Sequence, residues 1–277
     1  MPPLPAPRLA TVSLDGISVW TDTQLAWETG VIIAFSERGG GVSQAPYTGL
    51  NLASHVGDEP DAVDANRAHL LAALGIAQLR DSLTVPEQVH GDEIVLIDAP
   101  RVGSGAFAVA GRPPVPATDA LVTALEAVPL MLCFADCVPV ILVAPGPIIA
   151  VVHAGWRGAL ASLPGATALA VARMAGCSST ELRAYIGPHI RACHYEVDAT
   201  TMSHFVNTFG TLARAASGGL NLEAAVTTSL TDAGVATCSI ACLGTCTAEA
   251  TDRFFSYRAE QGLTGRHAAL ACILPRV

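Results

Sequence analysis

The sequence predicts a single layered α/β (α+β) domain in which mixed β-sheets are flanked by helices. Short apolar runs rich in β-branched residues recur along the chain and are separated by Gly- and Pro-containing turns. Helical patterns interrupt these runs irregularly, which argues against the regular βαβ repeat of a Rossmann fold. Of the 277 residues, 51% are hydrophobic and 14% are charged, so the chain can bury a large core.

The first part of the chain is expected to form an N-terminal extension over residues 1–28, followed by one catalytic domain over 29–277. The elements expected next, in chain order, are a strand over 31–36, a Gly/Pro-rich functional loop over 36–51, a helix over 61–74, and a hairpin of 83–89 with 94–98. The helix is predicted to end at Gly75, and the hairpin to turn at residues 90–92.

The remainder of the chain alternates between apolar strands and helices. The expected strands cover 119–123, 130–134, 138–143, 148–153, 184–186, 238–243 and 268–273. The expected helices cover 158–174, 198–209 and 222–233. The middle strands are almost wholly apolar, so they are predicted to lie at the centre of a mixed sheet.

Composition excludes several classes of function. The net charge of −9 argues against general nucleic-acid binding, and all fifteen basic residues are Arg, which excludes a Lys Schiff base. The most apolar stretch, 128–152, is broken by Asp136 and by Pro and Gly residues below spanning length. Residues 1–10 have no signal-peptide pattern, so a cytoplasmic protein with free or metal-binding thiols among its eight Cys is expected.

Three short segments, EQVHG, FADC and VVHAGWRG, each place one metal-binding side chain at the edge of an apolar run. These side chains are His90, Cys137 and His153. A catalytic zinc site uses three protein ligands of this kind and leaves a fourth position open. Each residue alone has another explanation. His90 could lie in a surface turn, Cys137 could be a buried structural Cys, and His153 could belong to a Gly-rich β–α turn. Together, the three residues favour a metal centre.

Other polar residues could complete such a site, although for each residue alone a solvated or salt-bridging role is favoured. Asp136 lies between core strands and needs partners there. The further candidates are Asn51, His55, Arg67, Asp119, Arg157, Ser256 and Arg258. Cys193, His194 and Glu196 suggest a second metal site, but a structural loop explains that segment as well.

The order of these segments resembles one family over residues 30–275. LNLASHVGD, EQVHG, TDALVT, ADCVPVIL, AVVHAGWRG, IGPHIRACHYEV and FFSYR follow one another as in the YfiH-type proteins. These are known as laccase-domain polyphenol oxidases, as peptidoglycan editing factors and as purine nucleoside phosphorylases with adenosine deaminase activity. The resemblance implies a fold related to toxin-type cysteine hydrolases, and His90, Cys137 and His153 as ligands of zinc.

The function implied by the resemblance is phosphorolysis of adenosine, inosine, guanosine or methylthioadenosine, with deamination of adenosine. The protein is then expected to bind small purine nucleosides and phosphate as a monomer or homodimer. For phosphate, Arg67, Arg157 and Arg258 are candidates because Arg binds phosphate bidentately. Asn51, His55 and Ser256 are further substrate-binding candidates, and Asp136 is the expected proton shuttle. Asp119 is placed to orient a ligand His.

Three other classes of function stay open. Copper in place of zinc would give a polyphenol oxidase, but a multicopper site needs many His ligands and the chain has eight His in all. Cys137 could instead be the nucleophile of a hydrolase acting on peptidoglycan precursors, with His153 as its base. A metal-storing or partner-binding protein would bind metal without turnover. His194 and Ala259 depart from the family pattern, without removing any of the three ligands.

Overall fold

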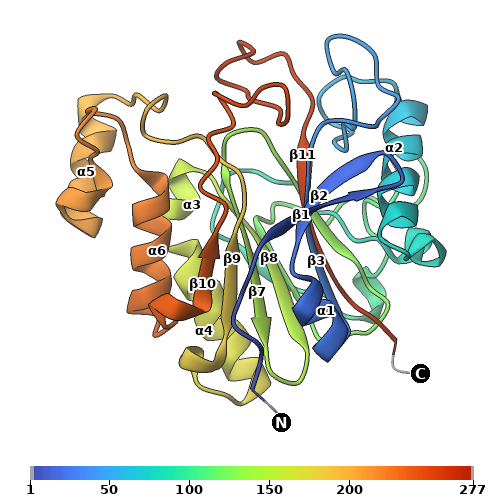
Figure 1. The fold of residues 1–277 in the computed structure, drawn as a ribbon, viewed down its shortest axis with the longest axis horizontal. Helices are drawn as coiled ribbons and strands as arrows, with labels where there is room; N and C mark the ends of the chain where they lie inside the picture. The colour runs from blue at the N-terminus through green and yellow to red at the C-terminus, as the bar shows by residue number, and fades with distance from the viewer. Residues whose placement is uncertain (1–2, 276–277) are drawn as a thin grey trace.

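The computed structural model describes residues 3–275, which form four layers: helices, a six-stranded sheet, a five-stranded sheet and one further helix (Figure 1). The strands are β1 (Ala10–Leu14), β2 (Ile17–Thr21), β3 (Val31–Ser36), β4 (Ile94–Leu96), β5 (Ala120–Thr123), β6 (Leu130–Phe134), β7 (Val138–Ala144), β8 (Ile148–Ala154), β9 (Arg183–Ile186), β10 (Ile240–Cys242) and β11 (His267–Ile273). The predicted fold class, mixed sheets flanked by helices, is confirmed.

Six α-helices and several short 3-10 turns connect these strands within the described range. The helices are α1 (Thr23–Thr29), α2 (Pro60–Ala73), α3 (Trp156–Leu160), α4 (Leu163–Ala175), α5 (Ala199–Phe209) and α6 (Leu222–Asp232). The 3-10 turns are η1 (Ala77–Ser82), η2 (Ala99–Arg101), η3 (Ser179–Glu181), η4 (Thr211–Ala213) and η5 (Thr237–Ser239). Among residues 3–275, no helix combines the length and the apolar character needed to cross a bilayer.

The two sheets pack against each other because both are apolar on the facing sides. The five-stranded sheet has the order β1-β2-β3-β11-β6, and the six-stranded sheet has the order β10-β9-β7-β8-β5-β4. The second sheet is mixed, since β10 pairs with β9 and β4 pairs with β5 in parallel. Every residue of β7, β8 and β11 is buried. These three strands are therefore covered on both faces, which explains their continuous apolar sequences.

Successive side chains along a strand point to opposite faces of the sheet, so they pack into different hydrophobic cores. In β8, Ile149 and Val151 face the other sheet, while Ala150 and Val152 face α4 and α6. The outer face of the five-stranded sheet is closed by α2. The segment predicted as an N-terminal extension contributes β1 and β2 to this sheet, and α1 packs against β3, so this segment packs with the domain.

Two local predictions are wrong. Segment 83–89 does not pair with 94–98: it forms isolated bridges at Thr84 and Pro86, and β4 pairs with the distant β5. The helix predicted over 158–174 is two helices, since Ser162 adopts a left-handed backbone (φ 58°) between α3 and α4. Pro164 in the first turn of α4 lacks an N–H group and is favoured at such a new start.

Candidate active site

Strand register brings Cys137, His153 and Asp119 to one edge of the six-stranded sheet. Cys137 immediately precedes β7, and β7 pairs with β8 so that Pro139 lies opposite His153. Ala120 of β5 lies opposite Val152, which places the preceding Asp119 beside His153. The backbone N–H of His153 donates to the carbonyl of Asp119 at 2.8 Å.

His90 reaches the same edge from the loop that precedes β4. Its backbone is left-handed, with φ 59°, which is uncommon for a residue other than Gly. Gln88 anchors this loop, because its side-chain amide exchanges two hydrogen bonds of 2.8 Å with the backbone of Cys133 in β6. The metal-binding atoms of His90, Cys137 and His153 lie within 4.8 Å of one another.

The carboxylate of Asp119 is fully buried and holds both the imidazole of His153 and the backbone of the loop that carries His90. It accepts the backbone N–H groups of Val89, His90 and Gly91 at 2.7 to 3.2 Å. One of its oxygens lies 2.7 Å from Nδ1 of His153. The other ring nitrogen of His153 is thereby left for Cys137 or a metal ion. This is the arrangement in which a carboxylate orients a metal-binding His.

Charge lowers the pKa of the Cys137 thiol despite its burial. Burial alone would raise that pKa, but His153 and His90 oppose it by charge and by hydrogen bonds and bring it to about 6. Burial would lower the pKa of His153, yet Cys137 and Asp119 raise it to about 9. A thiolate held between two imidazoles is the form in which Cys binds zinc or acts as a nucleophile.

Gly155 leaves room for this cluster. A Cβ at this position would lie 2.7 Å from Cδ2 of His90 and 3.4 Å from Sγ of Cys137. The first distance is too short for a real side chain. The first Gly of the HAGWRG segment is therefore needed so that the chain can pass close to the two ligand side chains.

The cluster opens into a pocket of about 480 Å³, within the size range of sites for small organic molecules. Its wall combines the three predicted metal ligands, cationic groups and aromatic rings. The lining residues are His55, Gln88, His90, Cys133, Ala135, Asp136, Cys137, His153, Trp156, Arg157, Tyr195, Tyr257, Arg258 and Arg266.

Three guanidinium groups line the pocket, each near an aromatic ring. Arg157 packs on Trp156 with its Cζ 4.8 Å from the ring centroid. Arg258 lies over Tyr195, and Arg266 lies over Tyr257, at 5.2 and 5.6 Å. Burial and the nearby guanidinium groups of Arg266 and Arg67 lower the pKa of His55. The pocket is thus locally cationic in a chain whose net charge is −9.

The structure places Asp136 differently from a free proton shuttle. Its backbone is left-handed, with φ 90°. Its carboxylate accepts three hydrogen bonds: from the hydroxyls of Thr247 and Ser256 at 2.6 and 2.7 Å, and from the backbone N–H of Arg258 at 2.6 Å. Asp136 therefore fixes the turn that carries Arg258. Ser256 is fully buried and contributes to this turn, not to the pocket wall.

Besides Ser256, two further predicted substrate-binding residues, Arg67 and Asn51, do not reach the pocket. The guanidinium of Arg67 is buried and donates to the carbonyls of Leu52, Gly105 and Ala106 at 2.9 to 3.0 Å, so it has no free donor fork for phosphate. Asn51 is also buried, and its side-chain oxygen accepts the backbone N–H of Arg266 at 2.9 Å. Its contact with the pocket is indirect, through the position of Arg266.

The comparisons with known proteins agree with this architecture. Residues 32–274 match the family model described as multi-copper polyphenol oxidoreductase laccase. The chain belongs to this family. It is 37% identical over 243 residues to a protein of Corynebacterium glutamicum named purine nucleoside phosphorylase, covering 85% of this chain and 92% of the relative. It is 34% identical over 250 residues to Geobacillus stearothermophilus YlmD, named likewise, covering 87% and 89%.

Solved structures of the family have the same fold. The crystal structure of YlmD from Geobacillus stearothermophilus aligns with a TM-score of 0.87 at 30% identity, over 97% of this chain and 100% of that one. The crystal structure of Bacillus licheniformis YfiH aligns with a TM-score of 0.86 at 28% identity, over 96% and 98%. The resemblance noted from the sequence motifs is confirmed.

The donor set suits a metal ion of the zinc type. Two imidazoles and one thiolate are the ligands zinc prefers, and three protein ligands leave one position for another molecule. The lowered pKa of Cys137 supplies the thiolate, and Asp119 sets the orientation of His153. Copper(I) also accepts such ligands, so the donor set indicates a soft or borderline metal.

Proposed function

We propose that this protein is a zinc-dependent phosphorylase of purine nucleosides, which it converts with phosphate to a purine base and ribose 1-phosphate. One observation carries the proposal: a single pocket joins the His90, Cys137 and His153 cluster to three Arg side chains and three aromatic rings. The curated relatives that cover most of this chain are named purine nucleoside phosphorylase.

The Arg side chains are assigned to phosphate. Phosphate is a dianion near neutral pH, and Arg is the only basic side chain with a permanent charge in a chain that lacks Lys. Arg157, Arg258 and Arg266 line the pocket and face a common space. Arg266 replaces Arg67 in this assignment because Arg266 lines the pocket, whereas Arg67 is buried outside it.

The aromatic side chains are assigned to the purine. Trp156, Tyr195 and Tyr257 offer flat apolar faces on the pocket wall, and purines stack on such faces.

In the reaction a phosphate oxygen forms a bond to C1′ as the C1′–N9 bond breaks. The electron pair of that bond leaves with the base, which takes up the proton that hydrogen phosphate releases. Zinc held by His90, Cys137 and His153 would supply Lewis acidity.

Adenosine deamination is a further activity that we propose for the same pocket. The His/Cys donor set resembles that of zinc nucleobase deaminases. Those enzymes use a free Glu as proton carrier, whereas Asp136 is engaged by three donors. Deamination is therefore proposed as the minor activity, with adenosine, inosine, guanosine and methylthioadenosine as phosphorolysis substrates.

The test separates these reactions by their products. Adenosine or inosine is incubated with zinc-loaded protein, with and without phosphate, and the products are separated by liquid chromatography. The proposal expects adenine or hypoxanthine only when phosphate is present, and loss of this product in His153→Ala. Equal release of base without phosphate would indicate hydrolysis and contradict phosphorolysis. Inosine formed from adenosine reports deamination.

A cysteine hydrolase is the second candidate, favoured by one specific observation. Asp119, His153 and Cys137 are joined by hydrogen bonds in the order acid, base and nucleophile, as in cysteine hydrolases. This alternative expects activity on amides of cell-wall precursors that survives chelation and is lost on thiol alkylation.

A polyphenol oxidase is less well supported, because only two clusters among residues 3–275 bring three or more metal-binding side chains together. Oxygen uptake with a phenol would report it.

A further inference from the structure

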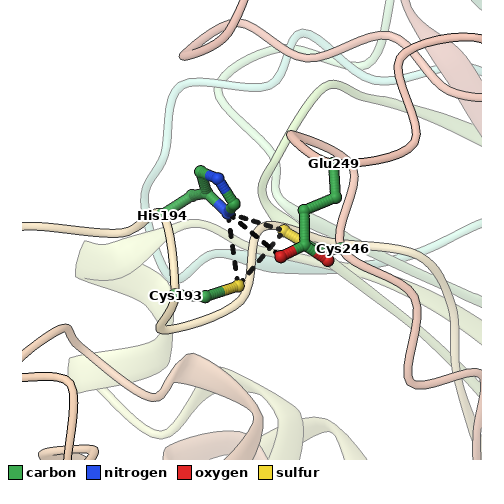
Figure 2. Close-up of side chains that lie close together, drawn as sticks. All are labelled: Cys193, His194, Cys246 and Glu249. Atoms are coloured by element: carbon green, nitrogen blue, oxygen red, sulfur yellow. Dashed lines mark hydrogen bonds and ion pairs between the residues drawn. The ribbon is translucent and has the colours of Figure 1, made fainter.

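We propose that a second metal ion, a structural zinc, binds outside the active-site pocket to Cys193, His194, Cys246 and Glu249. Figure 2 shows these four side chains pointing toward one another from two loops. Cys193 and His194 lie in the loop between β9 and α5, and Cys246 and Glu249 lie in the loop between β10 and β11. Their metal-binding atoms all lie within 4.8 Å of one another.

The spacing of the donor atoms matches a tetrahedron around zinc. With usual Zn–ligand bond lengths, tetrahedral geometry separates two sulfurs by about 3.8 Å, sulfur and nitrogen by about 3.6 Å, and nitrogen and oxygen by about 3.4 Å. The two Sγ atoms are 3.9 Å apart. Nδ1 of His194 lies 3.2 Å from Sγ of Cys193, 3.8 Å from Sγ of Cys246 and 3.5 Å from Oε1 of Glu249.

The chemistry of the donors also fits zinc. With both thiols ionised, two thiolates, one imidazole and one carboxylate carry a charge of −3, of which a divalent cation would offset two. The backbone N–H of Arg191 donates to Sγ of Cys246 at 3.3 Å and fixes the position of that sulfur.

Four protein ligands make this site structural. Catalytic zinc keeps an open position, and the cluster of His90, Cys137 and His153 has one, whereas the four-ligand set is closed. The sequence analysis grouped Cys193 and His194 with Glu196, whereas the carboxylate that lies near them in the structure is that of Glu249. Glu196 is not part of the cluster, and Cys246 and Glu249 come from a segment about fifty residues away.

The proposed ion would tie together two loops that shape the active-site pocket. Tyr195, next to His194, lines that pocket. Thr247, next to Cys246, donates its hydroxyl hydrogen bond to Asp136 at 2.6 Å. Neither loop has a helix or strand over the ligand residues themselves, so a cross-link there would restrict the motion of both.

The test counts metal ions in the purified, tag-free protein under reductant, which prevents a disulfide between Cys193 and Cys246. After zinc loading and dialysis, two zinc ions per chain are expected. The double variant Cys193→Ser/Cys246→Ser should bind one, and Cys137→Ser should also bind one. Cys238→Ser, an exposed Cys outside both clusters, should bind two.

Because Cys246 is buried, its variant could fail to fold, and substitution of the exposed ligands keeps the test decisive. His194→Ala or Glu249→Gln should weaken binding of one zinc at least tenfold in a chelator competition. The matched control Glu196→Gln should leave both affinities unchanged. Cobalt-loaded Cys137→Ser should retain thiolate-to-metal charge-transfer absorption, which only Cys193 and Cys246 would then provide.

The outcomes separate the two sites. One zinc in the wild type that is lost in Cys137→Ser overturns the second site and leaves the proposed function intact. Unchanged affinities in both His194→Ala and Glu249→Gln also overturn it. One zinc that is lost only in the double variant would support the second site and contradict the catalytic one.

Discussion

Asp119 and His153 are joined by a 2.7 Å contact between a carboxylate oxygen and Nδ1, in which neither side chain is exposed to solvent by more than 4%. The same carboxylate holds the loop that carries His90. One buried acid therefore sets the positions of two predicted metal ligands that are 63 residues apart in sequence. The positions of His90 and His153 consequently depend on a residue that does not line the pocket.

Asp119→Asn should weaken metal binding. The amide keeps the size of the side chain but offers one acceptor oxygen in place of two, so it cannot hold the loop at residues 89–91 and His153 equally well. A loss of about 10- to 100-fold in zinc affinity is expected, measured by competition with a chromogenic chelator. Asp64→Asn, which alters the surface pair with Arg80, is the control. Wild-type zinc affinity in Asp119→Asn would contradict this role.

Gly155→Ala should disturb His90 and Cys137 directly. The added methyl group would meet Cδ2 of His90 at 2.7 Å, so the ring must move away from its partners. The expected results are weaker zinc binding and a lower kcat/KM, with the fold retained in circular dichroism. In Gly39→Ala the added methyl group has no neighbour within 4 Å, and this variant should behave as wild type. Equal activity of the two variants would argue against a tight fit at Gly155.

Arg266→Gln should raise KM for phosphate more than KM for the nucleoside. A hydrogen bond to a charged group contributes about 1.5–3 kcal/mol, which corresponds to a loss of roughly 10- to 150-fold in phosphate binding. Initial rates at varied phosphate concentration measure it. Arg101→Gln, in an exposed pair with Asp98, is the control.

Arg67→Leu should lower stability without weakening phosphate binding, the reverse of the effect expected for Arg266→Gln. It removes the donor from three buried carbonyls, so the midpoint of urea unfolding should fall strongly. KM for phosphate in the folded fraction should stay near the wild-type value. A rise in that KM without loss of stability would restore Arg67 as a phosphate ligand.

His267 should make the protein less stable in mild acid. Burial, with smaller contributions from the charges of Arg266 and Arg38, lowers the pKa of this His from 6.5 to about 3. Between those values the unfolded chain binds a proton that the folded chain does not. The free energy of unfolding should therefore fall by about 1.4 kcal/mol per pH unit as pH decreases from 6.5 toward 3.

Urea unfolding at pH 7.5, 5.5 and 4.5 measures this dependence. His267→Gln should show a shallower fall over the same pH range, whereas His204→Gln, on the exposed face of α5, should keep the wild-type slope. Identical slopes in all three proteins would show that His267 is not the source.

Local sequence patterns were sufficient to predict most elements and the grouping of His90, Cys137 and His153. The apolar runs that form β6, β7 and β8 and the Gly-rich turn after His153 are local signals, and their pairing places Cys137 beside His153. The hairpin predicted around His90 failed because the partner of β4 is β5, a distant segment in parallel orientation. No local pattern distinguishes that pairing from a hairpin.

The roles of polar residues depended on the fold. Arg67 and Asn51 were assigned to substrate, but in the structure they bond to backbone groups that would otherwise be buried without partners. Arg266 was missed, although it directly precedes the apolar strand 267–273. A charged residue at the end of a central strand is the signal that could have identified it, since strand ends border the pocket in this fold.

The most direct test of the account is removal and return of the metal during phosphorolysis of inosine. Wild-type protein is stripped of metal with a chelator under reductant, its folding is checked, and hypoxanthine release is measured before and after addition of zinc. We expect release to be lost in the stripped protein and restored by zinc in the wild type, but not in His90→Ala. Full phosphate-dependent release by metal-free protein would contradict the proposed catalytic zinc and favour Cys137 as the reacting group.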